Sequence, residues 1–243
     1  IYAALMGTTV SGSLSDAHQA KVTAAVAAIK AAGDKAVVVS GIQDKGAQAL
    51  VLAINNALGS QVMDANSPRL TRQENGTEVK AVIESVVAGT LGGLITVGIN
   101  PAFTLPEGQA FAEGIKKLDL SVAFSMKEDE TASAAQYIAA LPHYLESWGD
   151  YEFKAGHYAL AQPTIRPLFD TLQFQDALLK WTGSEQNYYD AIQENWSSSI
   201  LGGSSCNSVL HDGFFSTGVT KDASFSSSDL SSSVAALAAS TAE

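Results

Sequence analysis

One stretch of the chain decides the fold class: Leu94-Ile95-Thr96-Val97, followed by Gly98-Ile99-Asn100-Pro101. The first four residues are apolar or β-branched without alternation, which is typical of a short strand covered on both faces of a sheet. Gly98 and the Asn100-Pro101 pair then predict a turn. Open α/β sheets bind their ligands beyond the carboxyl ends of parallel strands, so this turn is the first candidate for a binding site.

Strands and helices alternate on either side of this stretch. Two further apolar strands are expected at Ala36–Val39 and Leu120–Phe124. Apolar residues at helical spacing, with glycines at several ends, predict helices over 15–32, 46–58, 78–87, 109–118 and 131–139. The alternation predicts an α/β fold, with an open, mostly parallel Rossmann-like sheet and helices on both of its faces.

The chain after this region has a different character. Scattered aromatic residues predict a hairpin over Tyr151–Tyr158, with helices near Gln173–Trp181 and Asn187–Trp196. The remainder is rich in serine and poor in large apolar residues. We therefore expect three parts: an α/β nucleotide-binding-like domain at 1–141, an irregular aromatic extension at 142–196, and a serine-rich tail or linker at 197–243.

Composition excludes several classes of function. The chain has 14 basic and 25 acidic residues, for a formal net charge of −11. A nucleic-acid partner is not expected, since such binding needs clustered positive charge. The one cysteine, Cys206, cannot hold an iron–sulfur cluster or a four-cysteine zinc site. The uncharged run at 85–106 is broken by glycines and two prolines, so we expect no direct membrane span.

Familiar nucleotide and nucleophile motifs are incomplete in this sequence. Gly41–Gly46 has the glycine spacing of a phosphate loop, but Ala47 and Gln48 stand where lysine and serine or threonine are required. Cys206 lies five residues before His211, so a catalytic cysteine–histidine pair is an alternative. A lone thiol in a loop is more often incidental, and we expect no catalytic residue here.

Two polar groups admit both a structural and a functional interpretation. His143, Glu146 and His157 could supply nitrogen and oxygen ligands to a metal, but their spacing fits no compact zinc motif, so no metal ligand is expected. Glu128-Asp129-Glu130 precedes a helix and is expected to cap it, with a cation site as the weaker alternative. In the turn after the central strand, the Asn100 amide could read the edge of a base or pterin, or could serve an ordinary turn.

The order of several blocks resembles a known family. Gly98–Pro101, Ser125–Glu130, Ala132–Leu141 and Pro142–Glu146 follow one another at the spacing seen in the second nucleotide-binding half of molybdopterin oxidoreductases of the dimethyl-sulfoxide-reductase type. In that family a G-x-N-P turn ends a strand and faces the guanine dinucleotide. The resemblance therefore implies that Gly98, Asn100 and Pro101 occupy the corresponding ligand edge.

A narrower resemblance rests on three separate blocks. Phe124–Thr131, Leu145–Asp150 and Gln162–Thr171 are similar to the molybdopterin-like half of the large iron–sulfur subunit of bacterial alternative complex III. That complex oxidises quinol and passes electrons to a cytochrome c or directly to a terminal oxidase. The resemblance covers roughly residues 37–196.

This resemblance implies a scaffold and interaction role without chemistry. No cofactor is expected in this segment, and the turn candidates Gly98, Asn100 and Pro101 are expected to be vestigial. Iron–sulfur clusters are expected elsewhere in the subunit. The implied partners are other subunits of a membrane-bound respiratory complex, including the iron–sulfur half and cytochrome c-type subunits, and the implied location is the periplasmic face of the bacterial inner membrane.

Two other functions stay open from the sequence. One is the cofactor-binding domain of an active molybdopterin oxidoreductase, such as a sulfur-compound or oxyanion reductase. Against it, Trp148–Phe153 is bulky and acidic where active enzymes carry a G-T-x-x-N-type stretch for the pterin, and Lys127 and Lys154 each stand beside acids that would weaken their attraction for phosphate. The other is a free-standing α/β domain that binds a small molecule, which the intact turn keeps open.

Overall fold

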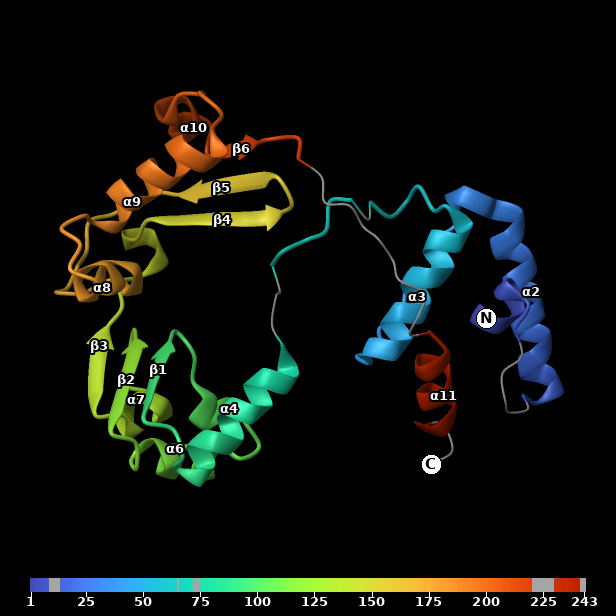
Figure 1. Ribbon diagram of the computed structural model, residues 1–243, viewed down its shortest axis with the longest axis horizontal. Helices are drawn as coiled ribbons and strands as arrows, with labels where there is room; N and C mark the ends of the chain where they lie inside the picture. Colours follow the sequence, from blue (N-terminus) through green and yellow to red (C-terminus); the bar gives the residue numbers. More distant parts are fainter. Residues whose placement is uncertain (9–13, 65, 72–74, 220–229, 241–243) are drawn as a thin grey trace. The chain divides into compact units, whose positions relative to one another are not determined.

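The computed structural model describes residues 1–8, 14–64, 66–71, 75–219 and 230–240. The chain forms two compact units, one from Ile1–Pro68 and Thr220–Glu243 and the other from Arg69–Val219 (Figure 1). The expected boundaries after residues 141 and 196 both fall inside the second unit. Compactness and family-domain boundaries are different properties, so the three ranges expected from the sequence remain a prediction.

The described part of the first unit is helical. Helix α3 begins where the Asp44 side chain accepts a hydrogen bond from the Ala47 N–H at 2.8 Å, and α11 packs against α3. Helices α2 and α3 confirm the helices expected at 15–32 and 46–58. The elements are α1 (Tyr2–Met6), α2 (Asp16–Ala32), the 3-10 turn η1 (Gly33–Lys35), α3 (Lys45–Leu58) and α11 (Leu230–Ser240).

The strand expected at Ala36–Val39 is wrong. This segment is extended but belongs to no sheet, and the Val39 side chain is 83% exposed. The side-chain amide of Asn55, on α3, accepts from the Val38 N–H at 2.7 Å and donates to the Val38 carbonyl at 2.8 Å. One amide thus takes the place of a neighbouring strand. The β-branched residues favour extended backbone, but a strand also requires a pairing partner.

The second unit contains two sheets and the helices around them. Its first half comprises α4 (Gly76–Ala88), β1 (Gly93–Val97), α5 (Pro101–Thr104), α6 (Gly108–Ile115), β2 (Leu120–Ser125), α7 (Glu130–Ala134) and β3 (Tyr137–Ala140). Its second half comprises η2 (Tyr144–Glu146), β4 (Gly149–Lys154), β5 (His157–Ala161), α8 (Phe174–Trp181), α9 (Tyr188–Asn195), the π-helical turn η3 (Trp196–Ile200), α10 (Cys206–Asp212) and β6 (Phe214–Ser216).

The first sheet is parallel, with strand order β1-β2-β3 (Figure 1). Phe124 on β2 lies in register with Val97 on β1 and Ala139 on β3. Helices from the preceding and intervening segments flank it. The expected α/β fold with a parallel sheet is therefore confirmed, as are the strands at 94–97 and 120–124 and the helices near 78–87 and 109–118.

The helix expected over 131–139 is only partly correct. Helix α7 ends at Ala134, and Tyr137–Ala140 is β3. Between them, the Gln136 N–H donates to Ser121 Oγ at 2.9 Å, and Gln136 Nε2 donates to the Leu118 carbonyl at 3.0 Å. These bonds hold the chain against the start of β2. Alanines accept either backbone conformation, so contacts fifteen and eighteen residues away in sequence make the choice.

Both faces of the parallel sheet meet helices. On one face a hydrophobic cluster joins α4, α6 and α7, with Leu94 of β1 packed against it; its buried members are Val86, Phe111, Ile115 and Ala134. Phe124 lies on the opposite face, because side chains alternate along a strand and its register partner Val97 is three residues from Leu94. There its ring meets Phe174 and Trp181 of α8 edge-on, at centroid distances of 5.0 and 6.0 Å.

The second sheet is antiparallel, with strand order β4-β5-β6. Its β4–β5 pair confirms the hairpin expected near Tyr151–Tyr158, and β4 also bends through an irregular register near its end. A second hydrophobic cluster lies beside it, built on buried Ile192, Trp196, Leu201 and Val209. Residues from the first part of the serine-rich tail thus contribute to a core. Residues 220–229 of that tail lie outside the described residues.

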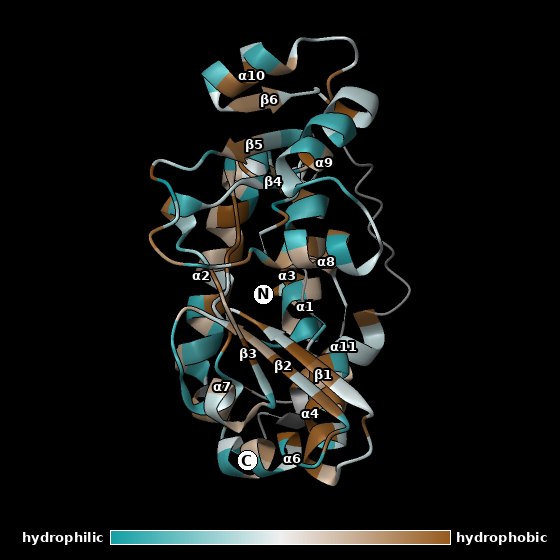
Figure 2. Cartoon of the chain, turned by 90° about the vertical axis from the view of Figure 1, so that its left-hand side faces the viewer, coloured by the Kyte–Doolittle hydropathy of each residue, from teal (hydrophilic) through white to brown (hydrophobic). Residues whose placement is uncertain are grey.

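The uncharged run at 85–106 forms the end of α4, the strand β1 and the short helix α5. Brown, hydrophobic stretches run along the strands of the parallel sheet (Figure 2). No helix in the described ranges combines the length and the apolar character that crossing a membrane needs.

The contact between α4 and α6 depends on Gly114. A Cβ atom placed there would overlap the carbonyl of Val86 on the facing helix. We expect Gly114→Ala to lower the free energy of unfolding by about 1–3 kcal/mol, because the two helices would have to separate. Gly92→Ala is the matched control, since a Cβ at Gly92 meets no atom within 4 Å. Denaturant unfolding of both variants is the measurement, and equal stability of the two would contradict this packing argument.

Candidate functional site

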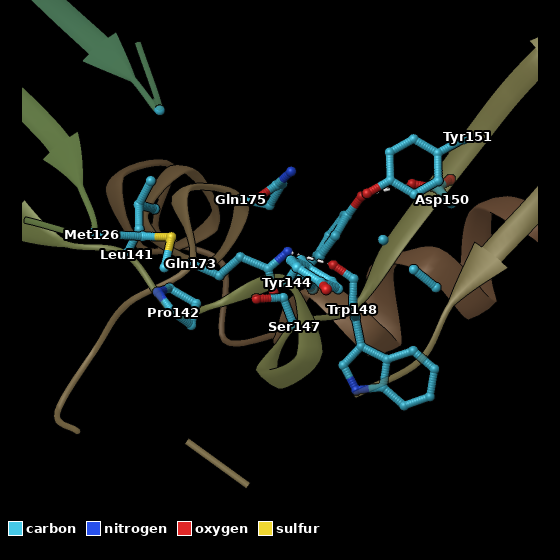
Figure 3. Close-up of a pocket in the computed structure, with 14 residues that line it drawn as sticks. Met126, Leu141, Pro142, Tyr144, Ser147, Trp148, Asp150, Tyr151, Gln173 and Gln175 are labelled. Atoms are coloured by element: carbon cyan, nitrogen blue, oxygen red, sulfur yellow. Dashed lines mark hydrogen bonds between the residues drawn. The ribbon is translucent and has the colours of Figure 1, made fainter. Parts of the chain in front are cut away.

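A pocket of about 390 Å³ lies at the carboxyl edge of the parallel sheet (Figure 3). Its lining includes Gly98 after β1, Met126 after β2, and Leu141 after β3. The opposite part of its lining comes from β4 and from the ends of α8 and α9. The pocket therefore occupies the place at which the sequence predicts a ligand edge.

Asp150 on β4 is the charged residue in the described lining of the pocket. Its Oδ1 accepts from the Tyr188 hydroxyl at 2.6 Å, and its Oδ2 accepts from Trp196 Nε1 at 3.0 Å. Burial, reinforced by the hydrogen bond to the Asp150 carboxylate, raises the pKa of Tyr188 well above its ordinary value. Tyr188 therefore stays protonated at neutral pH and acts as a donor to Asp150.

The adjoining wall is held by contacts of Trp148. Its indole stacks on the ring of Tyr189 with centroids 4.1 Å apart. Its carbonyl accepts a hydrogen bond from Gln173 Nε2 at 2.6 Å, which Figure 3 shows as a dashed line. Stacking and hydrogen bonding thus join the start of β4 to the starts of α8 and α9.

The charge of the lining is negative. Among the described residues that line this pocket, Asp150 carries the one formal charge, and none is a lysine, arginine or histidine. Within the described ranges no ion pair reaches Asp150, and Lys127 and Lys154 do not line the pocket. A pterin guanine dinucleotide carries phosphates, which require cationic side chains or clustered N–H donors. The residues of this pocket do not fit that group.

The turn after β1 is held together internally. Gly98 has a φ of 64° and lines the pocket, whereas Asn100 and Pro101 do not. Asn100 Nδ2 donates to Glu130 Oε2 at 2.6 Å, and its Oδ1 accepts from the Thr131 N–H at 3.2 Å and the Thr131 hydroxyl at 2.8 Å. Thr131 Oγ1 accepts in turn from the Ala102 N–H at 3.0 Å. Of the two roles that the sequence left open for this amide, the hydrogen bonds show the structural one, which ties the turn to α7.

The acidic triplet before α7 caps that helix, as expected. The Asp129 side chain accepts from the Ala132 N–H at 2.9 Å and from the Ser125 hydroxyl at 3.1 Å. Donation from Asn100 lowers the pKa of the exposed Glu130 carboxyl, with a further contribution from a backbone hydrogen bond. Both carboxylates are engaged in local structure.

The side chains of His143 and Glu146 make hydrogen bonds within their own turn. His143 and Glu146 form a capping box around η2: His143 Nδ1 accepts from the Leu145 N–H, and Glu146 accepts from the His143 N–H. His157 lies on β5. In the part of the chain that the structure describes, no three His, Cys, Asp or Glu side chains converge as a metal site would require. The structure therefore does not bring His143, Glu146 and His157 together as the alternative metal set that the sequence offered.

Cys206 and His211 occupy the two ends of α10. Cys206 packs against the cluster around Trp196. His211 is exposed and its Nδ1 lies 3.1 Å from Asp212 Oδ1. The structure gives no contact between the thiol and the imidazole, and the alternative of a catalytic pair gains no support.

Sequence patterns did not predict the Asp150–Tyr188–Trp196 network. Tyr188 and Trp196 follow Asp150 by 38 and 46 positions in the sequence, and nothing in their local sequence predicts that the three residues meet. The available signal was coarser. An acid among aromatic residues in Trp148–Phe153 needs hydrogen-bond donors if it is buried, and tyrosine or tryptophan elsewhere in the aromatic segment could supply them.

Comparison with known proteins places this geometry in context. No protein-family model matches the chain. It is 32% identical over 115 residues to the menaquinone reductase, molybdopterin-binding-like subunit, of Nitratidesulfovibrio vulgaris strain Hildenborough. The likeness is to a molybdopterin-related family. The match covers 46% of this chain and 17% of that protein, so this chain spans less than a fifth of its relative. The match does not single out alternative complex III.

Among solved structures, acetylene hydratase from Pelobacter acetylenicus is similar with a TM-score of 0.46 and 16% identity. The superposition covers 56% of this chain and 20% of that one.

Asn100→Ala tests the structural role of the turn. The substitution leaves the buried Thr131 N–H and hydroxyl without their acceptor, so the free energy of unfolding should fall by about 1–3 kcal/mol. Asn207→Ala, at an exposed position on α10 in the same unit, is the control and should change stability far less. Denaturant unfolding measures both, and an unchanged stability for Asn100→Ala would show that the amide does not hold this turn.

The same variant should change the titration of Glu130. Because the Asn100 donor lowers the pKa of Glu130 in the folded protein, the bond stabilises the fold above the ordinary carboxyl pKa, and this contribution is lost as the pH falls through the lowered value. In Asn100→Ala the Glu130 pKa should rise toward its ordinary value in a carboxyl NMR titration. Glu113 is the internal control, since Lys116 lowers its pKa independently.

Proposed function

We propose that this chain is a cofactor-free scaffold and interaction part of a membrane-associated, quinone-linked electron-transfer complex. It descends in this proposal from a molybdopterin-binding domain whose ligand edge no longer holds the cofactor. Electron transfer and quinone chemistry then belong to other parts of the assembly, and this chain contributes no catalytic residue.

The name of the relative supports the general class. A menaquinone reductase subunit described as molybdopterin-binding-like combines quinone chemistry with a molybdopterin-type fold. Because the match covers only part of either protein, its activity and partners enter here as proposals. The three blocks that resemble alternative complex III support that complex as the more specific assignment, with the iron–sulfur half and cytochrome c-type subunits as partners on the periplasmic face of the inner membrane.

The charge of the pocket is the observation that carries the cofactor-free role. At the edge where the family would place a nucleotide, the described residues of the lining include Asp150 and no cationic side chain. Asn100, the polar side chain of the G-x-N-P turn, is committed to Glu130 and Thr131. An anionic dinucleotide in this pocket would meet negative charge, and it could bind the Asn100 amide only if that amide gave up its hydrogen bonds to Glu130 and Thr131.

Metal and cofactor analysis of the native protein tests this proposal. The full protein that contains this chain is purified with its partner subunits from cells supplied with molybdate. We expect less than about one-tenth molar equivalent of molybdenum or tungsten and no extractable guanine dinucleotide, because the pocket offers phosphates no counter-charge. Iron is expected in the assembly, on subunits or regions that supply cysteines.

An active molybdoenzyme purified from the same culture is the control for metal supply and recovery. It must contain stoichiometric molybdenum in the same assay. Stoichiometric molybdenum, tungsten or dinucleotide in the protein that contains this chain would overturn the scaffold role and establish the cofactor-binding alternative.

A further inference from the structure

The pocket at the sheet edge has one apolar end and one polar end. In Figure 3, Met126, Leu141 and Pro142 lie together on one side, and Asp150 and Tyr151 lie on the other. A volume of about 390 Å³ is in the range that holds a small organic molecule. The shape of the lining therefore favours a ligand with one apolar part and one polar part.

The polar end is an oriented carboxylate with acceptor capacity left. Tyr188 and Trp196 each donate one hydrogen bond, one to each oxygen of Asp150. A carboxylate offers about four lone-pair sites, so the two donors among the described residues leave acceptor capacity for a ligand. Both donors are neutral, and therefore the negative charge of Asp150 is not cancelled by the groups that hold it in place.

The surrounding side chains favour a cation over other ligands. Tyr144 and Tyr151 add aromatic rings to the lining, and ring faces attract cations. Gln175 and Ser147 add neutral polar groups. An anion would be repelled by Asp150, and a neutral ligand would cover a carboxylate without supplying the charge that its desolvation requires.

We propose that this pocket binds a small organic cation, a primary ammonium joined to a short apolar group. The ammonium lies against Asp150 and donates to its open lone pairs. The apolar group lies against Met126, Leu141 and Pro142. Such a site selects a cation, whereas a nucleotide site selects an anion. The proposal does not depend on the scaffold role proposed above.

Binding of 2-phenylethylammonium to the purified full protein tests this assignment. Calorimetric titration should give saturable binding, and the neutral isostere 2-phenylethanol should bind about tenfold or more weakly, since the charge-assisted hydrogen bond to Asp150 is lost. The anion 3-phenylpropionate should not bind. Equal binding of the amine and the alcohol, or no binding of the amine, overturns the proposal.

Asp150→Asn should weaken binding of the amine about tenfold or more, whereas Asp119→Asn, which removes an exposed carboxylate outside the pocket, should leave it unchanged. Because Asp150 also accepts hydrogen bonds from Tyr188 and Trp196, the first variant could lose its fold. Gln175→Lys avoids this problem by placing a positive charge in the lining, and it should abolish binding of the amine.

Gln175→Met is the matched control for the lysine variant, with a neutral side chain of similar length, and it should retain binding. Loss of binding in both Gln175 variants would show that the amine needs the Gln175 amide itself. That result would contradict the argument that the added positive charge prevents binding. Absence of molybdenum from the protein has no bearing on this titration, so failure of the scaffold role and failure of the cation site can be told apart.

Discussion

The two hydrogen bonds that the Asp150 carboxylate accepts are the interactions on which the region from η2 to β6 depends. This carboxylate lies on β4 and accepts hydrogen bonds from Tyr188 on α9 and from Trp196, a fully buried indole at the start of η3. A buried indole N–H without an acceptor would cost free energy, and so would a half-buried carboxylate without donors. Each group therefore stabilises the position of the other, and the hairpin is joined to the helices that cover it.

The same carboxylate determines the character of the pocket. It brings a negative charge to the lining of the pocket at the carboxyl edge of the parallel sheet, where the family to which the chain is similar is expected to hold a phosphate-bearing cofactor. On the other side of that edge, the amide of Asn100 is turned toward Glu130 and Thr131. The Asn100 amide is thus engaged within the protein, which supports the proposed scaffold role. The charge that the lining does present has the sign that attracts a cation.

Local patterns predicted many of the longer elements of the chain. Helical spacing located α2, α3, α4 and α6, and short β-branched runs located β1 and β2, because these segments pack as their own sequences prefer. The pattern was misleading where a distant side chain decided the outcome. The Asn55 side-chain amide hydrogen-bonds to the backbone N–H and carbonyl of Val38, where a strand would have paired. Gln136 holds the chain against β2, so that an alanine-rich segment continues as β3.

By itself, the sequence determined the α/β class, the parallel sheet, and the edge of that sheet at which a pocket lies, since the hydrophobic period and the alternation of strands with helices are properties of neighbouring residues. It also determined the acidic balance of the chain and its lack of cluster ligands. Only the tertiary structure decided that Asp150 lines the pocket and that Asn100 does not. Those positions depend on donors and acceptors 30 to 46 residues away, and no local pattern records which distant groups will meet.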